Sequence, residues 1–154
     1  MATEIERKYL VNKEKWNALS KPTGTLIRQG YLLIDPDKTI RVRFTDSKSY
    51  LTIKGPSRGA TRQEYEYEIP WVEAEELFNT CSDSKVIKVR YEIVFKGKKW
   101  EVDMFQGENE GLIIAEIELK SESEYFEIPD WIEKEVTEDK IYYNSSLSVR
   151  PYTT

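Results

Sequence analysis

The segment Glu64-Tyr65-Glu66-Tyr67-Glu68-Ile69 decides the fold class, because charged and apolar residues alternate in it one by one. Successive side chains of a β-strand point to opposite faces of the sheet, so this alternation is typical of a strand with two unlike faces. The same period of two recurs through most of the chain. The sequence therefore indicates a protein built mainly of β-strands.

Eight stretches carry the period-two pattern between turn signals. They are residues 3–11, 26–34, 39–46, 50–54, 62–69, 86–95, 99–105 and 112–120. Hairpin turns are predicted at residues 35–38 and 96–99, and a glycine-bounded loop at residues 107–111. Eight mostly antiparallel strands in one small domain favour closure into a barrel, which removes exposed sheet edges.

Helical patterns are few, and we expect helices only at residues 12–19, 71–79 and 138–147. The expected fold class is therefore mainly β, or α+β by content: an eight-stranded antiparallel closed β-barrel with a few peripheral helices. A chain of 154 residues suits one domain better than two, so a single domain over residues 1–154 is expected. The interior of such a barrel holds side chains or one small ligand.

Composition excludes several classes of function. The chain has no histidine and a single cysteine, Cys81, which excludes Ser–His–Asp and Cys–His catalysis, an internal disulfide and most zinc sites. A net charge of −5 argues against an extended basic surface for nucleic acid. The sequence has no apolar run of about 18 residues and no basic-then-apolar N-terminus, so we expect a cytoplasmic protein without a membrane partner.

The charged residues that share a strand face are partly sorted by sign. Some strands carry only carboxylates in this alternation and others only cations, whereas a solvated surface usually mixes signs. The residues that share a face within one strand are Glu4, Glu6 and Lys8; Arg41 and Arg43; Glu64, Glu66 and Glu68; Lys88 and Arg90; Glu101 and Asp103; and Glu116, Glu118 and Lys120.

Alternation alone leaves two orientations open. In the first, which the pattern by itself favours, the charges face solvent and the apolar faces fill an ordinary barrel. In the second, the charges line the interior, and the apolar residues, rich in tryptophan and tyrosine, must be covered from outside. The few helices cover that face only partly, and a homodimer could cover more of it.

Charges inside a barrel need counter-charges. Two carboxylates about 5 Å apart at an effective dielectric near 20 repel by roughly 3 kcal/mol. Glu4 with Glu6, and Glu116 with Glu118, would form such pairs if their two strands were neighbours. A divalent cation removes that repulsion, and oxygen ligands suit Mg²⁺ or Mn²⁺. The cations would then need a highly charged anion, and paired arginines favour phosphate. A polyphosphate that bridges the metal and the basic residues satisfies both sets.

The chain resembles the CYTH family, which is named for a bacterial class of adenylyl cyclase and for thiamine triphosphatase. Glu4-Ile5-Glu6-Arg7-Lys8 is similar to the E-x-E-x-K signature that opens these proteins. The likeness continues in the family's order over nearly the whole chain, which makes it far more specific than the opening motif alone. The further matching segments are residues 29–32, 41–43, 51–55, 64–68, 87–90, 102–105, 111–112, 115–118, 135–137 and 143–147.

The resemblance implies an eight-stranded antiparallel tunnel with the charges inward, and it assigns three sets of residues. One or two divalent ions would be held by Glu4, Glu6, Glu116 and Glu118. The phosphate chain would be bound by Lys8, Arg41, Arg43, Lys54, Lys88 and Arg90. The candidate catalytic residues are Lys8, Glu64 and Asp103, with one of the two carboxylates as proton acceptor. Tyr142 and Tyr143 are expected to pack against a helix.

The expected activity is metal-dependent hydrolysis of a triphosphate. Inorganic triphosphate is the first-choice substrate, because no nucleobase pocket is evident near the motifs, and nucleoside or thiamine triphosphates come next. Two alternatives stay open at this point: an adenylyl cyclase that uses the same tunnel, and a non-catalytic module that binds polyphosphate or nucleotide.

Overall fold

The computed structural model describes residues 3–152, and nine strands in it form one sheet. They are β1 (Thr3–Val11), β2 (Thr25–Asp35), β3 (Lys38–Phe44), β4 (Ser49–Lys54), β5 (Thr61–Ile69), β6 (Ser84–Phe95), β7 (Lys98–Phe105), β8 (Ile113–Glu118) and β9 (Ile132–Glu135). The eight predicted strands are all confirmed, and each end lies within two residues of the expected position. The two predicted hairpin turns are also present, at Pro36-Asp37 and Lys96-Gly97.

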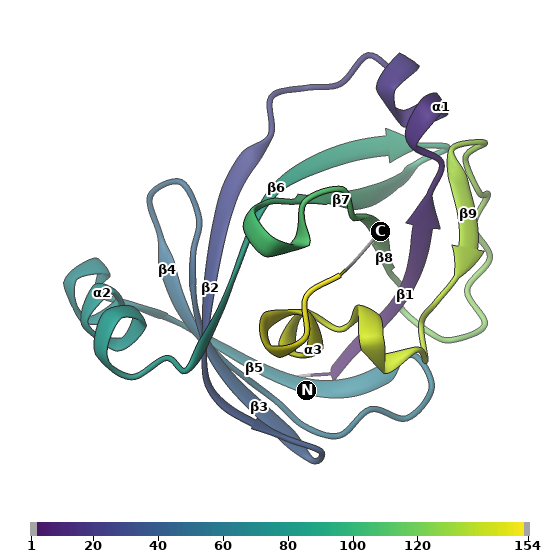
Figure 1. Cartoon of the computed structure of the whole chain (residues 1–154). Helices are drawn as coiled ribbons and strands as arrows, with labels where there is room; N and C mark the ends of the chain where they lie inside the picture. The colour runs from purple at the N-terminus through teal and green to yellow at the C-terminus, as the bar shows by residue number, and fades with distance from the viewer. Residues whose placement is uncertain (1–2, 153–154) are drawn as a thin grey trace.

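The sheet closes on itself through β1. Its strand order is β5-β4-β3-β2-β6-β7-β8-β1-β9, and a further pairing joins β5 to β1. All strand pairs are antiparallel, and Glu4 of β1 lies opposite Arg62 of β5 where the barrel closes. The closed eight-stranded antiparallel barrel expected from the sequence is therefore confirmed. Figure 1 shows the barrel with the C-terminal helix in front of its interior.

The ninth strand, β9, was missed by the sequence interpretation. It has four residues, three of them charged and none in a clear alternation, so no pattern marks it as a strand. It pairs with the end of β1, where Tyr9 lies opposite Glu135 and Val11 opposite Ile132. Strand β9 thus continues the edge of β1 beyond the short pairing with β5.

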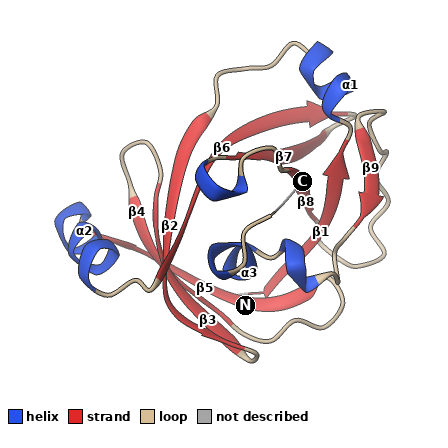
Figure 2. Cartoon of the chain, in the orientation of Figure 1, coloured by secondary structure: helices blue, strands red, loops and turns tan. Residues whose placement is uncertain are grey.

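Three short α-helices within residues 3–152 lie outside the sheet: α1 (Lys13–Ala18), α2 (Trp71–Thr80) and α3 (Asn144–Val149). Figure 2 colours them blue together with two turns of 3-10 helix. The expected helix at residues 138–147 is wrong in its extent. Residues 140–142 form one turn of 3-10 helix, and Tyr143 is extended with φ −68° and ψ 139°, so the α-helix begins only at Asn144. The break turns the chain toward the barrel interior. No helix within residues 3–152 is long and apolar enough to cross a membrane.

The apolar outer face of β1, β6, β7 and β8 is covered by segments that are remote in sequence. Trp16 of α1 and Trp131 pack against Trp100 of β7. The ring centroid of Trp131 lies 5.4 Å from that of Trp16 and 6.1 Å from that of Trp100. All three indoles are almost fully buried, and Phe126 packs against the same cluster. These contacts provide the outer cover that the inward orientation of the charges requires.

Two further apolar clusters fix the remaining helices. Helix α2 lies on the outer face of β3, where its Ala74 and Phe78 bury Val42 and Phe44. Helix α3 places Leu147 among Tyr31, Val86, Phe105, Leu112 and Ile114. Because Tyr31 and Ile114 belong to the inward-facing sets of their strands, this second cluster closes one end of the barrel interior.

Candidate active site

A cavity of about 240 Å³ occupies the barrel interior, and charged side chains line it. Eleven of the twelve residues that the sequence singled out reach it: Glu4, Glu6, Lys8, Arg41, Arg43, Lys54, Glu64, Lys88, Arg90, Glu116 and Glu118. The charges therefore point inward, as the family resemblance implied and as alternation alone did not favour. The twelfth residue, Asp103, does not line the cavity and is only 1% exposed.

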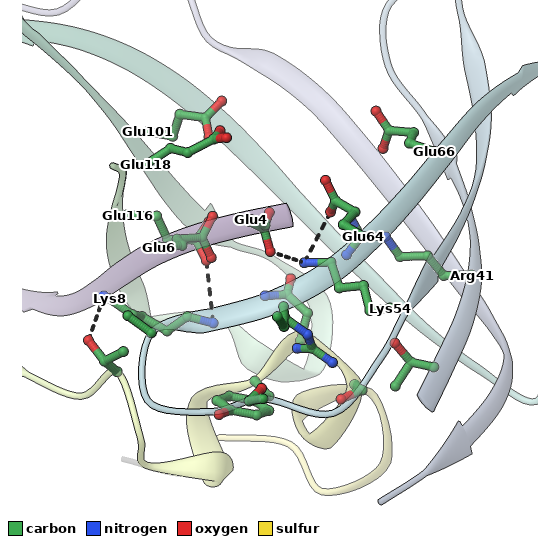
Figure 3. Close-up of a pocket in the computed structure, with 18 of the residues that line it drawn as sticks. Glu4, Glu6, Lys8, Arg41, Lys54, Glu64, Glu66, Glu101, Glu116 and Glu118 are labelled. Atoms are coloured by element: carbon green, nitrogen blue, oxygen red, sulfur yellow. Dashed lines mark hydrogen bonds and ion pairs between the residues drawn. The ribbon is translucent and has the colours of Figure 1, made fainter. Parts of the chain in front are cut away.

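Carboxylates from three adjacent strands gather on one side of this cavity (Figure 3). Glu6 of β1, Glu116 of β8 and Glu101 of β7 each offer an oxygen atom, and these atoms all lie within 4.8 Å of one another. Strand register explains the grouping, because Glu6 lies opposite Glu118, and Glu116 lies opposite Glu101. Three converging carboxylates form a donor set that fits a hard divalent cation.

The pKa shifts of these carboxylates also indicate that the cluster favours a nearby positive charge. Burial and the nearby carboxylates of Glu116 and Glu4 raise the pKa of Glu6 well above its ordinary value. Burial acts in the same direction on Glu116, but Lys8, Arg90 and Lys88 outweigh it, and the pKa of Glu116 falls well below its ordinary value. Without a cation, Glu6 therefore tends to keep its proton beside an ionised Glu116.

Of the other two predicted metal ligands, Glu4 is engaged by a cation and Glu118 is the more exposed. Lys54 Nζ lies 3.1 Å from Glu4 Oε1 and 3.4 Å from Glu64 Oε2, so one ammonium bridges β1 and β5. Glu118 lies beside Glu101 in Figure 3, and burial raises its pKa. Glu101 joins the carboxylate group, although the sequence assigned it no role.

Asp103 lies behind the cavity wall and holds two cations in place. Its carboxylate accepts two hydrogen bonds from Arg90, at 2.8 Å from Nε and 2.9 Å from Nη2, and lies 2.7 Å from Lys88 Nζ. These cations outweigh the effect of burial and lower the pKa of Asp103. An ionised carboxylate with these partners does not reach a substrate in the cavity, so the geometry does not favour Asp103 as the proton acceptor.

Arg41 and Arg43 of β3 differ from the other cations, because neither forms an ion pair with any residue among 3–152. Arg41 is only 6% exposed, and its Nε has no hydrogen-bond partner among residues 3–152. Burial and the neighbouring Arg41 and Arg90 lower the pKa of Arg43 to about 10. A buried and a half-buried guanidinium group on one strand, neither paired with a carboxylate of the described residues, form a donor set that suits an anion.

Several residues that line the cavity were missed by the sequence interpretation. Arg62 and Glu101 share the alternation of neighbours that were chosen, so the period-two pattern could have found them. Tyr143 and Asn144 reach the cavity because the chain bends after the 3-10 turn, and no periodicity signals that bend. Tyr143, which was expected to pack against a helix, lines the cavity, and its ring centroid lies 5.2 Å from Lys8 Nζ. Tyr142 does pack against the apolar cluster around Leu147.

The fold and the cavity together define a closed β-tunnel with a charged interior that fits a metal ion and a polyanion. A family model described as the CYTH domain matches residues 2–152. The chain belongs to the CYTH family.

The most similar proteins include two curated inorganic triphosphatases. The one from Acetivibrio thermocellus is 52% identical over 153 residues, which cover 99% of this chain and 97% of that protein. The one from Nitrosomonas europaea is 36% identical and covers 96% of this chain and 97% of that protein. Each is similar over practically its full length, so the likeness includes every strand that contributes to the tunnel.

Solved structures give the same result. The crystal structure of the inorganic triphosphatase NE1496 matches with a TM-score of 0.66 at 34% identity, over 97% of this chain and 96% of that one. A Bacillus halodurans protein that was provisionally named an adenylate cyclase matches with a TM-score of 0.65 at 19% identity, over 79% and 84% of the two chains. The second likeness shows the shared fold only.

Proposed function

We propose that this protein hydrolyses inorganic triphosphate in its tunnel with the help of a divalent metal ion. The observation that carries the proposal is the pair Arg41, which is buried, and Arg43, which is half-buried; neither has a carboxylate partner among residues 3–152, and both line the same cavity as three converging carboxylates. A polyphosphate would supply negative charge to the two arginines, and the metal ion bound to it would supply positive charge to the three carboxylates. The two relatives named inorganic triphosphatases support this substrate.

The six cations bind the phosphate chain in this proposal. Arg41 and Arg43 offer planar guanidinium groups that donate two hydrogen bonds each to phosphate oxygens. Lys8, Lys54 and Arg90 are ion-paired with carboxylates in the free protein, and an incoming phosphate competes with those carboxylates. The cations then neutralise charge that develops on the phosphate oxygens during transfer to water, which is the main catalytic contribution in such reactions.

The carboxylates Glu6, Glu101 and Glu116 would hold the metal ion, with Glu4 and Glu118 completing the donor set. Their oxygen-only chemistry favours Mg²⁺ or Mn²⁺ over zinc. A bound ion supplies charge neutralisation and acidifies a water molecule. Ionisation of Glu6 is a condition for binding, because a carboxyl group must lose its proton to ligate a metal ion and the pKa of Glu6 is raised well above its ordinary value.

Glu64 is the proposed proton acceptor for the attacking water. It lines the cavity, and burial raises its pKa despite the nearby Lys54, which makes it a stronger base than an ordinary carboxylate. Lys8 would bind the phosphate chain at the cavity wall, where its Nζ lies 3.3 Å from Glu116 Oε2. Asp103 contributes by orienting Lys88 and Arg90.

The cavity lining favours an inorganic substrate. Among the described residues that line it, only Tyr31 and Tyr143 are aromatic and only Ala60 is aliphatic, and Tyr31 is just 2% exposed. A nucleobase or thiazole ring would therefore find little apolar surface to bury. Nucleoside and thiamine triphosphates rank lower for this reason, and so does the cyclase activity, which needs a bound nucleoside.

The deciding experiment measures phosphate release from inorganic triphosphate, ATP and thiamine triphosphate with Mg²⁺, Mn²⁺ or EDTA. We expect metal-dependent turnover, fastest with inorganic triphosphate. Product analysis of the ATP reaction separates hydrolysis from cyclisation, because a cyclase yields cyclic nucleotide and pyrophosphate. Tight binding without turnover of any of the three substrates would make the protein a polyphosphate-binding module instead.

A further inference from the structure

Asn144, the first residue of α3, reaches into the tunnel and contacts two of its inward-facing residues. Its Oδ1 accepts a hydrogen bond from Lys88 Nζ at 2.8 Å and another from Gln29 Nε2 at 3.3 Å. Because an ammonium group can only donate, the atom that faces Lys88 must be the oxygen of the amide. The amide nitrogen is then left as a donor without a protein acceptor within residues 3–152, on a side chain that lines the cavity.

Gln29 extends this contact to the arginines of β3. Its side chain is fully buried, and its Oε1 accepts a hydrogen bond of 2.7 Å from Arg43 Nε. The carboxamide of Gln29 therefore links Asn144 to Arg43, and both amides are neutral acceptors for cations. One side chain from α3 thus sets the position of Lys88 directly and that of Arg43 through Gln29.

The end of the chain is held firmly enough to act as a fixed support. Leu147 is 2% exposed within the apolar cluster that closes this end of the tunnel. Asn109 Nδ2 donates a hydrogen bond of 3.2 Å to Leu147 O, and Asn109 Oδ1 accepts one of 2.7 Å from Tyr152 N. A further hydrogen bond of 2.8 Å joins Ser148 to Ser84 of β6. Helix α3 is therefore attached to the rest of the molecule at Leu147 and at Ser148.

A neutral acceptor at this position has an electrostatic advantage over a carboxylate. Lys88 is faced by Asp103 and Glu116, which favour its charged form, and by Arg90 and Arg43, which disfavour it. Burial is the largest influence and lowers the pKa of Lys88 to about 7. Asp103, 2.7 Å from Nζ, already supplies one negative charge, and the amide oxygen of Asn144 orients the same ammonium group without adding a second.

We propose that Asn144 is a positioning residue for substrate binding, through which α3 sets the orientation of Lys88 and Arg43 toward the phosphate chain. The inference rests on the proposed function, since it assumes that these two cations bind inorganic triphosphate. It gives α3 a role in the reaction in addition to closing the tunnel end.

The test compares Asn144→Ala and Asn144→Asp with the wild-type protein in Mg²⁺-dependent phosphate release from inorganic triphosphate, over a range of pH. Loss of a hydrogen bond to a charged group should raise KM by about tenfold or more in Asn144→Ala. The alkaline limb of kcat/KM should move to lower pH in Asn144→Ala, because Lys88 loses an acceptor. It should move to higher pH in Asn144→Asp, because a carboxylate stabilises the charged lysine.

Asn109→Ala is the matched control, because it loosens the attachment of α3 without removing the contact to Lys88. It should lower the unfolding temperature while the pH of the alkaline limb stays where it is in the wild type.

Isothermal titration of inorganic triphosphate without metal gives a readout that is independent of turnover, and Asn144→Ala should bind about tenfold more weakly. If the wild type turns over substrate but both Asn144 variants keep wild-type KM and pH profiles, the inference is refuted; a wild type that fails to turn over refutes the proposed function instead.

Discussion

Arg41 is buried in the tunnel wall, and its Nε has no hydrogen-bond partner in the part of the chain that the structure describes, so it lowers the stability of the free protein. Replacing it with methionine removes this group at similar volume. We predict that Arg41→Met raises the free energy of unfolding by about 1 kcal/mol or more. The same variant should bind inorganic triphosphate at least about tenfold more weakly.

Arg41→Lys separates the charge of this residue from its shape. It keeps the positive charge but loses the planar guanidinium group, and we expect binding between that of the wild type and that of Arg41→Met. Urea unfolding and isothermal titration on all three proteins measure the two effects. A methionine variant that is less stable than the wild type, yet binds equally well, would contradict this interpretation.

Lys88 makes stability depend on pH in a defined direction. Burial lowers its pKa to about 7 from an ordinary value of 10.5, so between these values the unfolded chain binds more protons than the folded one. Stability from this group therefore rises with pH above 7, by at most about 1.4 kcal/mol per pH unit, and is constant below 7. The wild type should gain stability relative to Lys88→Met from pH 7 to pH 9. Urea unfolding at each pH measures the difference, and parallel curves would disprove the low pKa.

Among the elements, α2 approaches β2 closely enough to require a glycine. A Cβ atom at Gly30 would lie 2.9 Å from Phe78 Cδ2 and 2.9 Å from Ser82 Oγ. We predict that Gly30→Ala shifts the end of α2 and costs about 1–3 kcal/mol of stability. At Gly55 the nearest atoms belong to Gln63 at 3.7 Å, so Gly55→Ala should leave stability unchanged or raise it slightly. Thermal unfolding of both variants tests the comparison, and equal losses would argue against a close contact at α2.

The strands were predictable at this scale and the C-terminal elements were not. Alternation marks β5 and β7 because polar and apolar residues follow one another singly over residues 64–69 and residues 99–104. Strand β9 is too short to show a period, and its pairing depends on the free edge of β1. Helix α3 starts late because Tyr143 is extended, and that conformation brings Asn144 to Lys88.

For the whole molecule, ligands should stabilise the fold by relieving like-charge repulsion in the tunnel. Mg²⁺ should act at the carboxylates and inorganic triphosphate at the arginines, each by about 2.7 kcal/mol at a hundredfold excess over its dissociation constant. We predict that Glu6→Gln abolishes the Mg²⁺-dependent rise in unfolding temperature and keeps most of the rise caused by inorganic triphosphate in EDTA. Differential scanning fluorimetry measures both. If Mg²⁺ stabilises the variant and the wild type equally, the ion binds elsewhere.

A homodimer stays a prediction. The outer face of β5 carries Tyr65 and Tyr67, which are 40% and 56% exposed and face away from the tunnel residues Glu64 and Glu66. The cover over the tryptophan cluster is complete within one chain, so the apolar outer face there does not require a second copy. Sedimentation velocity would measure the oligomeric state directly.

The sequence by itself determined which residues share a face, because a strand sends successive side chains to opposite sides whatever surrounds it. In this way Glu4, Glu6 and Lys8 were grouped correctly before any fold was known. Alternation could not determine which face is inside, because it is unchanged when the two faces are exchanged. The sorting of the charges by sign favoured the inward orientation, and the family resemblance implied it. The tertiary structure decided that question by placing Trp16 and Trp131, which are remote in sequence, over the outer face of Trp100. It also brought Tyr143 and Asn144 into the cavity, since contacts between distant segments depend on how the barrel closes.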